Sequence, residues 1–174
     1  MSATLKWGLI TGMVYVIFSL ISNLLGLQQG GGNLGLTFLF NTILLAATFF
    51  TIYLGVKEIR DEATGEYFTL GEAFSAGFKI TLIAAVIAAV FTFIYLKFID
   101  PDLMDKVMSS AEEKWDEMNV PEENREMGRK FQGYFSNPYI LSAFVILSVI
   151  FWGLIKSLVA GMMLRKNPPI APSA

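Results

Sequence analysis

The chain has 174 residues, of which 54% are hydrophobic and 16% are charged, and its mean hydropathy is +0.55. A soluble domain usually carries about 25% charged residues, so this composition indicates an integral membrane protein. The net charge of −2 argues against a nucleic-acid partner, and the lack of cysteine and histidine excludes disulfides, thiolate metal sites and the usual proton shuttle.

The first half of the chain predicts two helices that cross a bilayer. Residues 7–56 contain no charge, and one helix of that length would far exceed a hydrocarbon core of about 30 Å. The chain must therefore turn back, and 28–33, with three adjacent glycines, is the predicted turn. We predict spans over 7–27 and 34–56. The run after Lys6 is too long for a signal peptide, so we interpret it as an uncleaved span.

A polar loop, in which residues 64–66 are a predicted turn, leads to a third span over 74–96. This span ends before Lys97 and Pro101, because proline disfavours helix in the residue before it. A fourth span is predicted over 138–164, and the proline-containing tail 167–174 is predicted to be disordered.

Between the last two spans, 101–136 is a predicted extramembrane segment of two amphipathic helices. Its excess of acidic residues argues against attraction to anionic lipid. We therefore favour docking on the bundle, or binding of a protein partner through 103–135. The predicted apolar positions are Met104, Val107, Met108, Ala111, Trp115 and Met118 in the first helix, and Met127, Phe131, Tyr134 and Phe135 in the second.

The predicted fold is therefore all-α, a four-helix transmembrane bundle in a single domain, with both termini on one side of the membrane. The positive-inside rule slightly favours the cytoplasmic side for the termini. The basic residues close to the membrane on that side are Lys6, Lys57, Arg60, Lys79, Lys156, Arg165 and Lys166.

Two charged residues, Lys79 and Lys156, lie inside the predicted spans. Ionisable residues in a membrane are costly and often mark a pathway, so these lysines and Glu72 are a candidate site for an ion, a proton or an anionic substrate. The alternative is that each lysine extends to the lipid headgroups, as long side chains do near helix ends. On the predicted topology the two lysines lie toward the same face and can be neighbours. Asn23 and Asn41 are available for hydrogen bonds between helices.

Small residues recur at every fourth position in three of the predicted spans. Such stripes let helix backbones approach closely, either within one chain or in a homodimer. The predicted packing positions include Gly8, Gly12, Gly77, Gly153, Ser157 and Gly161.

Several motifs occur together in this chain. They are the exit at Lys57 to Arg60, Phe68-Thr69-Leu70-Gly71-Glu72-Ala73-Phe74 before Gly77-Phe78-Lys79, Tyr95 with Phe98-Ile99-Asp100-Pro101, and Phe135-Ser136-Asn137-Pro138. This arrangement resembles a bacterial family of four-span membrane proteins, domain of unknown function 4199. The resemblance covers nearly the whole chain and implies a bacterial cytoplasmic membrane, but no activity and no catalytic residue.

The residues contain no metal cluster, nucleophile motif or phosphate loop, so we expect no enzyme, no metal and no cofactor. Our first hypothesis is a non-enzymatic accessory or scaffold protein of the membrane that presents the acidic segment to a partner. The alternative is a small oligomeric transporter or channel that uses Lys79, Lys156 and Glu72.

Overall fold

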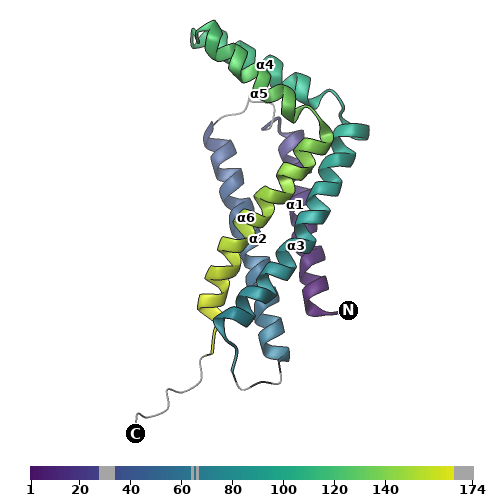
Figure 1. The fold of residues 1–174 in the computed structure, drawn as a ribbon, viewed down its shortest axis with the longest axis vertical. Coiled ribbons are helices and arrows are strands. Elements are labelled where there is room, and N and C mark those ends of the chain that lie inside the picture. The colour runs from purple at the N-terminus through teal and green to yellow at the C-terminus, as the bar shows by residue number, and fades with distance from the viewer. Residues whose placement is uncertain (28–33, 64, 66, 167–174) are drawn as a thin grey trace.

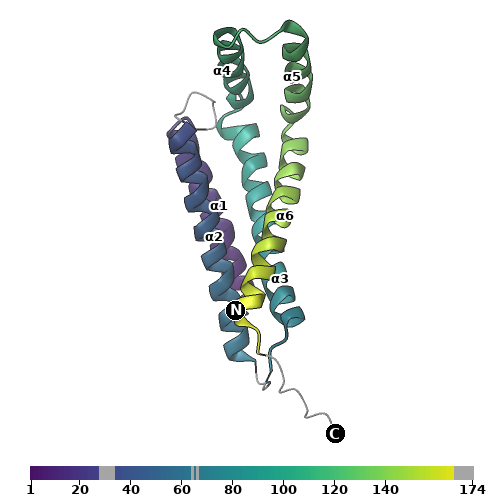
Figure 2. The ribbon, with the colours of Figure 1, turned by 90° about the vertical axis from the view of Figure 1, so that its left-hand side faces the viewer.

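The computed structural model describes residues 1–27, 34–63, 65 and 67–166, and it is helical almost throughout. Four long helices form a bundle, and two shorter helices extend beyond one end of it (Figures 1 and 2). In chain order the elements are α1 (Ala3–Leu24), α2 (Leu34–Glu62), α3 (Leu70–Ile94), a π-helical turn η1 (Tyr95–Ile99), α4 (Leu103–Glu117), α5 (Glu122–Phe135) and α6 (Pro138–Leu164).

The four long helices are each long and apolar enough to cross a membrane, as the sequence predicts. Their outer surface is covered by large apolar side chains, and Val86, Leu147 and Phe151 are 57%, 65% and 60% exposed. A soluble protein rarely exposes so large an apolar surface, whereas hydrocarbon solvates it well. The protein is therefore a multi-pass membrane protein.

Local signals in the sequence set where two of the spans begin. Thr69 and Glu72 form a reciprocal capping box at the start of α3, with the Glu72 carboxylate accepting from the Thr69 backbone N–H at 2.8 Å. Asn137 caps α6, and Pro138 occupies its first turn, where no backbone N–H is needed. Helix α2 continues to Glu62, beyond the predicted end at residue 56, so its last turns carry charged residues. The predicted turn over 28–33, residues 64 and 66 of the predicted turn over 64–66, and the tail 167–174 lie outside the described residues.

Helix α3 is the centre of the bundle, and its most extensive contacts are with α6 and α1. The buried positions of α3 are small residues such as Ala73, Ala84 and Ala85, each 0–1% exposed. Ile52 and Val56 of α2 pack with Ile80 of α3 in a buried cluster toward the end of the bundle at which α1 begins and α6 ends. Small residues thus lie inside and large ones outside, which is the pattern that close helix packing in lipid requires.

The predicted stripes of small residues lie at contacts between helices of one chain. A methyl group added at Gly8 or Gly12 of α1 would come within 2.7 Å and 2.6 Å of Ile83 and Ile87 of α3. At Gly77 it would come within 2.8 Å of Ser157, and at Gly161 within 3.1 Å of Leu70. Gly153 faces Thr81 still more closely. These residues are therefore packed against other helices of the same chain, and a second copy is not needed to cover them.

Helices α4 and α5 form an antiparallel hairpin beyond the bundle, at the end away from the N-terminus (Figures 1 and 2). The Arg129 guanidinium donates to Glu112 at 2.9 Å, and Arg125 pairs with Asp116, so each ion pair joins the two helices. The Trp115 ring lies directly over Gly128, where a Cβ would meet it at 2.6 Å. The predicted extramembrane segment is therefore a helical hairpin whose two helices are joined by ion pairs.

Charged and aromatic side chains mark both ends of the bundle. At the N-terminal end, Lys6 pairs with Glu58 at 2.5 Å, and the Trp7 indole N–H donates to the same carboxylate at 2.9 Å. At the hairpin end, the ammonium group of Lys97 lies 5.3 Å from the ring centroid of Phe93 and 5.8 Å from that of Tyr139. Lysines and aromatic rings of this kind are typical of the two membrane–water interfaces.

Candidate functional site

Lys156 of α6 is the buried cation of the bundle. Lys156 is 5% exposed, and its ammonium group donates to the Thr48 hydroxyl of α2 at 2.6 Å and to the Tyr15 hydroxyl of α1 at 3.3 Å. The ammonium also lies 5.7 Å from the centroid of the Tyr15 ring. Three spans therefore contribute to one polar site, and Thr48 itself is fully buried.

The direction of α6 sets which way the Lys156 side chain leans along the bundle. Side chains on an α-helix lean toward the helix N-terminus. Figure 1 shows that helix α6 runs from the hairpin end toward the end that carries the N-terminus. A side chain that leans toward the N-terminus of α6 therefore leans toward the hairpin end of the bundle. Because Lys156 is buried and its ammonium group donates to Thr48 and Tyr15, the alternative in which it extends to the lipid headgroups does not hold for this lysine.

The depth of the site follows from the helix rise of 1.5 Å per residue. Tyr15 lies about 12 Å along α1 from Trp7, and Thr48 lies about 15 Å along α2 from Glu58. Trp7 and Glu58 belong to the charged network at the N-terminal end of the bundle. The distance of the Lys156 ammonium from this network is therefore about half the 30 Å thickness of a bilayer core.

No carboxylate within ion-pair distance of Lys156 is present in the described part of the chain, where the ion pairs involve Lys6, Arg60, Lys106, Arg125 and Arg129. The Thr48 hydroxyl already donates to the Leu44 carbonyl at 2.8 Å, so toward Lys156 it acts as an acceptor. Two neutral oxygen atoms therefore solvate the ammonium group, and no side chain among the described residues neutralises its charge.

Two cavities meet at this site. The lateral cavity, about 510 Å³, is lined by Tyr15, Phe38, Asn41, Thr42, Leu44, Leu45, Ser148, Val149, Trp152 and Lys156. The central cavity, about 310 Å³, lies between all four spans on the hairpin side of Tyr15, and Leu103 and Met104 of α4 close part of its wall. Tyr15, Asn41 and Leu44 line both cavities, so the Tyr15 ring lies at their junction.

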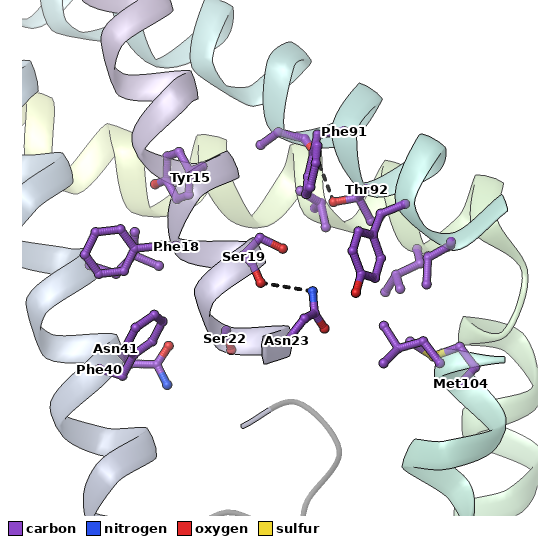
Figure 3. Close-up of a pocket in the computed structure, with 17 residues that line it drawn as sticks. Tyr15, Phe18, Ser19, Ser22, Asn23, Phe40, Asn41, Phe91, Thr92 and Met104 are labelled. Atoms are coloured by element: carbon purple, nitrogen blue, oxygen red, sulfur yellow. Dashed lines mark hydrogen bonds between the residues drawn. The ribbon is translucent and has the colours of Figure 1, made fainter. Parts of the chain in front are cut away.

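The central cavity carries several polar groups (Figure 3). Asn23 and Ser19 of α1 lie between the Phe40 ring of α2 and the Thr92 side chain of α3. The Asn23 amide donates to the Ser19 carbonyl at 2.9 Å, and the Asn41 amide donates to the Thr37 carbonyl at 2.9 Å. Both amide groups thus bond to their own helix, which corrects the expectation that they join helices. The Asn23 Oδ1 atom is buried without a hydrogen-bond partner.

The other predicted site residues lie elsewhere. Lys79 is exposed on α3, and it lines a shallow hollow together with Glu72 near the N-terminal end of the bundle. Helix α3 runs in the direction opposite to α6. Lys79 and Lys156 do not line the same cavity, and the Glu72 carboxylate caps α3.

Sequence reasoning missed the partners of Lys156. Tyr15 and Thr48 are single polar residues in otherwise apolar spans, and no spacing in the sequence connects either one with Lys156. Their positions on the inner faces of α1 and α2 depend on how each helix is rotated about its axis. Apolar residues occur on all sides of these uncharged spans, so the sequence does not indicate how each helix is rotated about its axis.

No curated protein and no solved structure matches the chain. One family does match, over residues 6–166, which include all four spans and the hairpin. That family is described as a protein of unknown function, so it supplies no ligand or reaction for the site around Lys156. The chain belongs to this family, DUF4199.

Proposed function

We propose that this protein is a non-enzymatic membrane carrier that binds an anionic molecule inside its helical bundle, with Lys156 as the binding residue. Its main support is the buried ammonium group, which among the described residues contacts hydroxyl groups and no carboxylate. A charged lysine at the centre of a membrane helix costs about 2.5–3.5 kcal/mol on insertion scales. A bound anion offsets this cost, because it supplies the missing opposite charge.

The position of the site supports a role in carriage across the membrane. Binding sites near the bilayer midplane, at the junction of two halves of a bundle, are the usual arrangement in secondary transporters. The two cavities lie on the hairpin side of Lys156 and beside it. On the other side, Ile52, Val56 and Ile80 are packed together, and the Lys6–Glu58 ion pair holds α1 to α2. In this proposal the N-terminal end must open for the ligand to leave.

The test uses the full chain in liposomes of uncharged lipid, with radiolabelled inorganic phosphate, acetate and hexadecanoate as probes. We expect Lys156-dependent binding and flux of at least one probe. Lys156→Met removes the charge at similar length and is expected to reduce both by about tenfold or more, as the loss of a charge-assisted hydrogen bond does.

Lys79→Met is the matched control, because it removes the other intramembrane lysine, which lies exposed on α3. This variant is expected to retain binding and flux. If none of the three probes binds in a manner that depends on Lys156, the proposed function is wrong.

A scaffold role remains a second candidate, and the hairpin supplies its specific support. Met127, Phe131 and Tyr134 of α5 follow one another on one helix face and are 68%, 65% and 68% exposed. An exposed apolar stripe with aromatic residues is typical of a protein-binding surface. If this stripe binds a partner, a crosslink formed in cells between α5 and that partner is expected to be lost in Phe131→Glu and preserved in Glu126→Gln. A crosslink that survives Phe131→Glu contradicts the scaffold role.

For the cellular location we propose the cytoplasmic membrane of a bacterium, with both termini in the cytoplasm. The basic residues Lys57, Arg60 and Arg165 support this orientation, because they lie at the end of the bundle where α2 and α6 end.

A further inference from the structure

The lateral cavity opens toward the bilayer between α2 and α6. Its rim is made of large apolar side chains that face outward, with Phe38 and Leu45 on α2 and Trp152 on α6, which are 75%, 45% and 48% exposed. In a membrane these side chains contact lipid. A molecule dissolved in the bilayer therefore reaches the cavity from the side, without passing through either membrane surface.

The two ends of the lateral cavity differ in chemistry. At the end toward the N-terminal side of the bundle, the Lys156 ammonium and the Tyr15 hydroxyl lie 3.3 Å apart. From Lys156 the wall continues along α6 to Ser148, about 12 Å at 1.5 Å per residue. Between these ends the wall is apolar, and it is formed by Leu44, Leu45, Val149 and Trp152.

The polar residues at the far end do not form a second ionic site. The Thr42 hydroxyl donates to the Phe38 carbonyl at 2.8 Å, and the Asn41 amide donates to the Thr37 carbonyl at 2.9 Å. The Thr42 hydroxyl hydrogen and one of the two Asn41 amide hydrogens are therefore used within α2. Within the lateral cavity, the fixed positive charge lies at Lys156, and the space extending away from it is suited to hydrocarbon.

From this arrangement we infer that the ligand is an acidic amphiphile, a single hydrocarbon chain ending in a carboxylate or a phosphate monoester. It enters from the bilayer between α2 and α6. Its acid group accepts hydrogen bonds from Lys156 and Tyr15, and its chain lies against Leu45 and Trp152. This inference rests on the proposed function and narrows it, because a water-soluble anion would instead reach Lys156 through the central cavity.

Binding is measured with the full chain in nanodiscs of uncharged phosphatidylcholine. The amphiphilic probes are hexadecanoate and hexadecyl phosphate, and the matched soluble probes are acetate and inorganic phosphate. We expect both amphiphiles to bind at least about tenfold more tightly than the soluble anion with the same acid group. We expect Lys156→Met to weaken amphiphile binding about tenfold or more, and Lys79→Met to leave it unchanged.

The position of the chain is tested with hexadecanoate brominated near its middle, which quenches nearby tryptophan. Trp152 lines the lateral cavity, whereas Trp7 packs near Gly55, and Trp115 lies over Gly128 in the hairpin. Saturable quenching is therefore expected in the wild type. It is expected to remain in Trp115→Phe and to be lost in Trp152→Phe.

The outcomes separate this inference from the proposed function. If acetate or phosphate binds as tightly as the amphiphiles and still requires Lys156, an anion site exists, but the ligand is not an amphiphile. If hexadecanoate binds equally to the wild type and to Lys156→Met, the probe only partitions into the membrane, and the inference is wrong. If no probe binds with dependence on Lys156, both proposals fail.

Discussion

Lys156→Met is expected to make the protein without ligand more stable, by about 1–4 kcal/mol of unfolding free energy. The substitution removes a charge that is buried among helices and has no carboxylate partner among the described residues. It also leaves Thr48 satisfied, because that hydroxyl donates to the Leu44 and Leu45 carbonyls at 2.8 and 3.1 Å. A gain in stability from losing a polar contact indicates a residue retained for binding rather than for folding.

Reversible unfolding in mixed detergent micelles, followed by circular dichroism, measures this gain. Lys79→Met serves as the control and is expected to change the free energy by less than about 0.5 kcal/mol, because Lys79 is exposed on α3. A clear loss of stability in Lys156→Met would show instead that the ammonium group holds α1, α2 and α6 together.

Gly153→Ala is expected to destabilise the bundle by about 1–3 kcal/mol. A Cβ at this position of α6 would overlap the side chain of Thr81 on α3. Thr81 cannot easily move away, because it is 1% exposed and its hydroxyl donates to the Gly77 carbonyl at 3.0 Å. The two backbones must therefore separate, at the interface with the most extensive contacts in the fold.

Gly71→Ala provides a matched comparison, since it makes the same chemical change in a helix. The nearest atom to a Cβ at Gly71 is the Thr69 hydroxyl oxygen at 4.0 Å, so the methyl group has room. Here the change is expected to be neutral or stabilising by up to about 1 kcal/mol, because alanine loses less backbone freedom than glycine on folding. Equal effects of the two substitutions on the unfolding free energy would contradict the close packing of α3 and α6.

The spans could be predicted from the sequence because lipid imposes one requirement on the backbone. Segments without charge can cross hydrocarbon only if every backbone N–H and C=O group bonds within the segment, and a helix satisfies this. The hairpin was also predictable, since its charges exclude 103–135 from the membrane and its apolar residues repeat at helical spacing. Thr69 and Glu72 carry the sequence signature of a capping box, although Glu72 was considered only as a candidate site residue.

The two intramembrane lysines show what composition alone does not settle. Both lie within a few turns of the N-terminal end of the bundle, yet Lys79 is exposed and Lys156 is buried. The difference follows from the helix face on which each lysine lies, because Lys156 faces Thr48 and Tyr15 inside the bundle, whereas Lys79 lies on an outer face of α3. The partners Tyr15 and Thr48 could not be predicted, because uncharged spans give no signal for how each helix is rotated.

The most direct test of an anion site at Lys156 is the effect of an acidic ligand on stability. A ligand that binds only the folded protein adds about 2.7 kcal/mol at a concentration 100-fold above its Kd. With hexadecanoate at that excess over the wild-type Kd, the unfolding free energy of the wild type is expected to rise by about this amount. That of Lys156→Met is expected to rise by about 1.4 kcal/mol or less, because its Kd is about tenfold or more higher. An equal rise in both proteins, or no rise in either, would contradict the assignment of Lys156 as the binding residue.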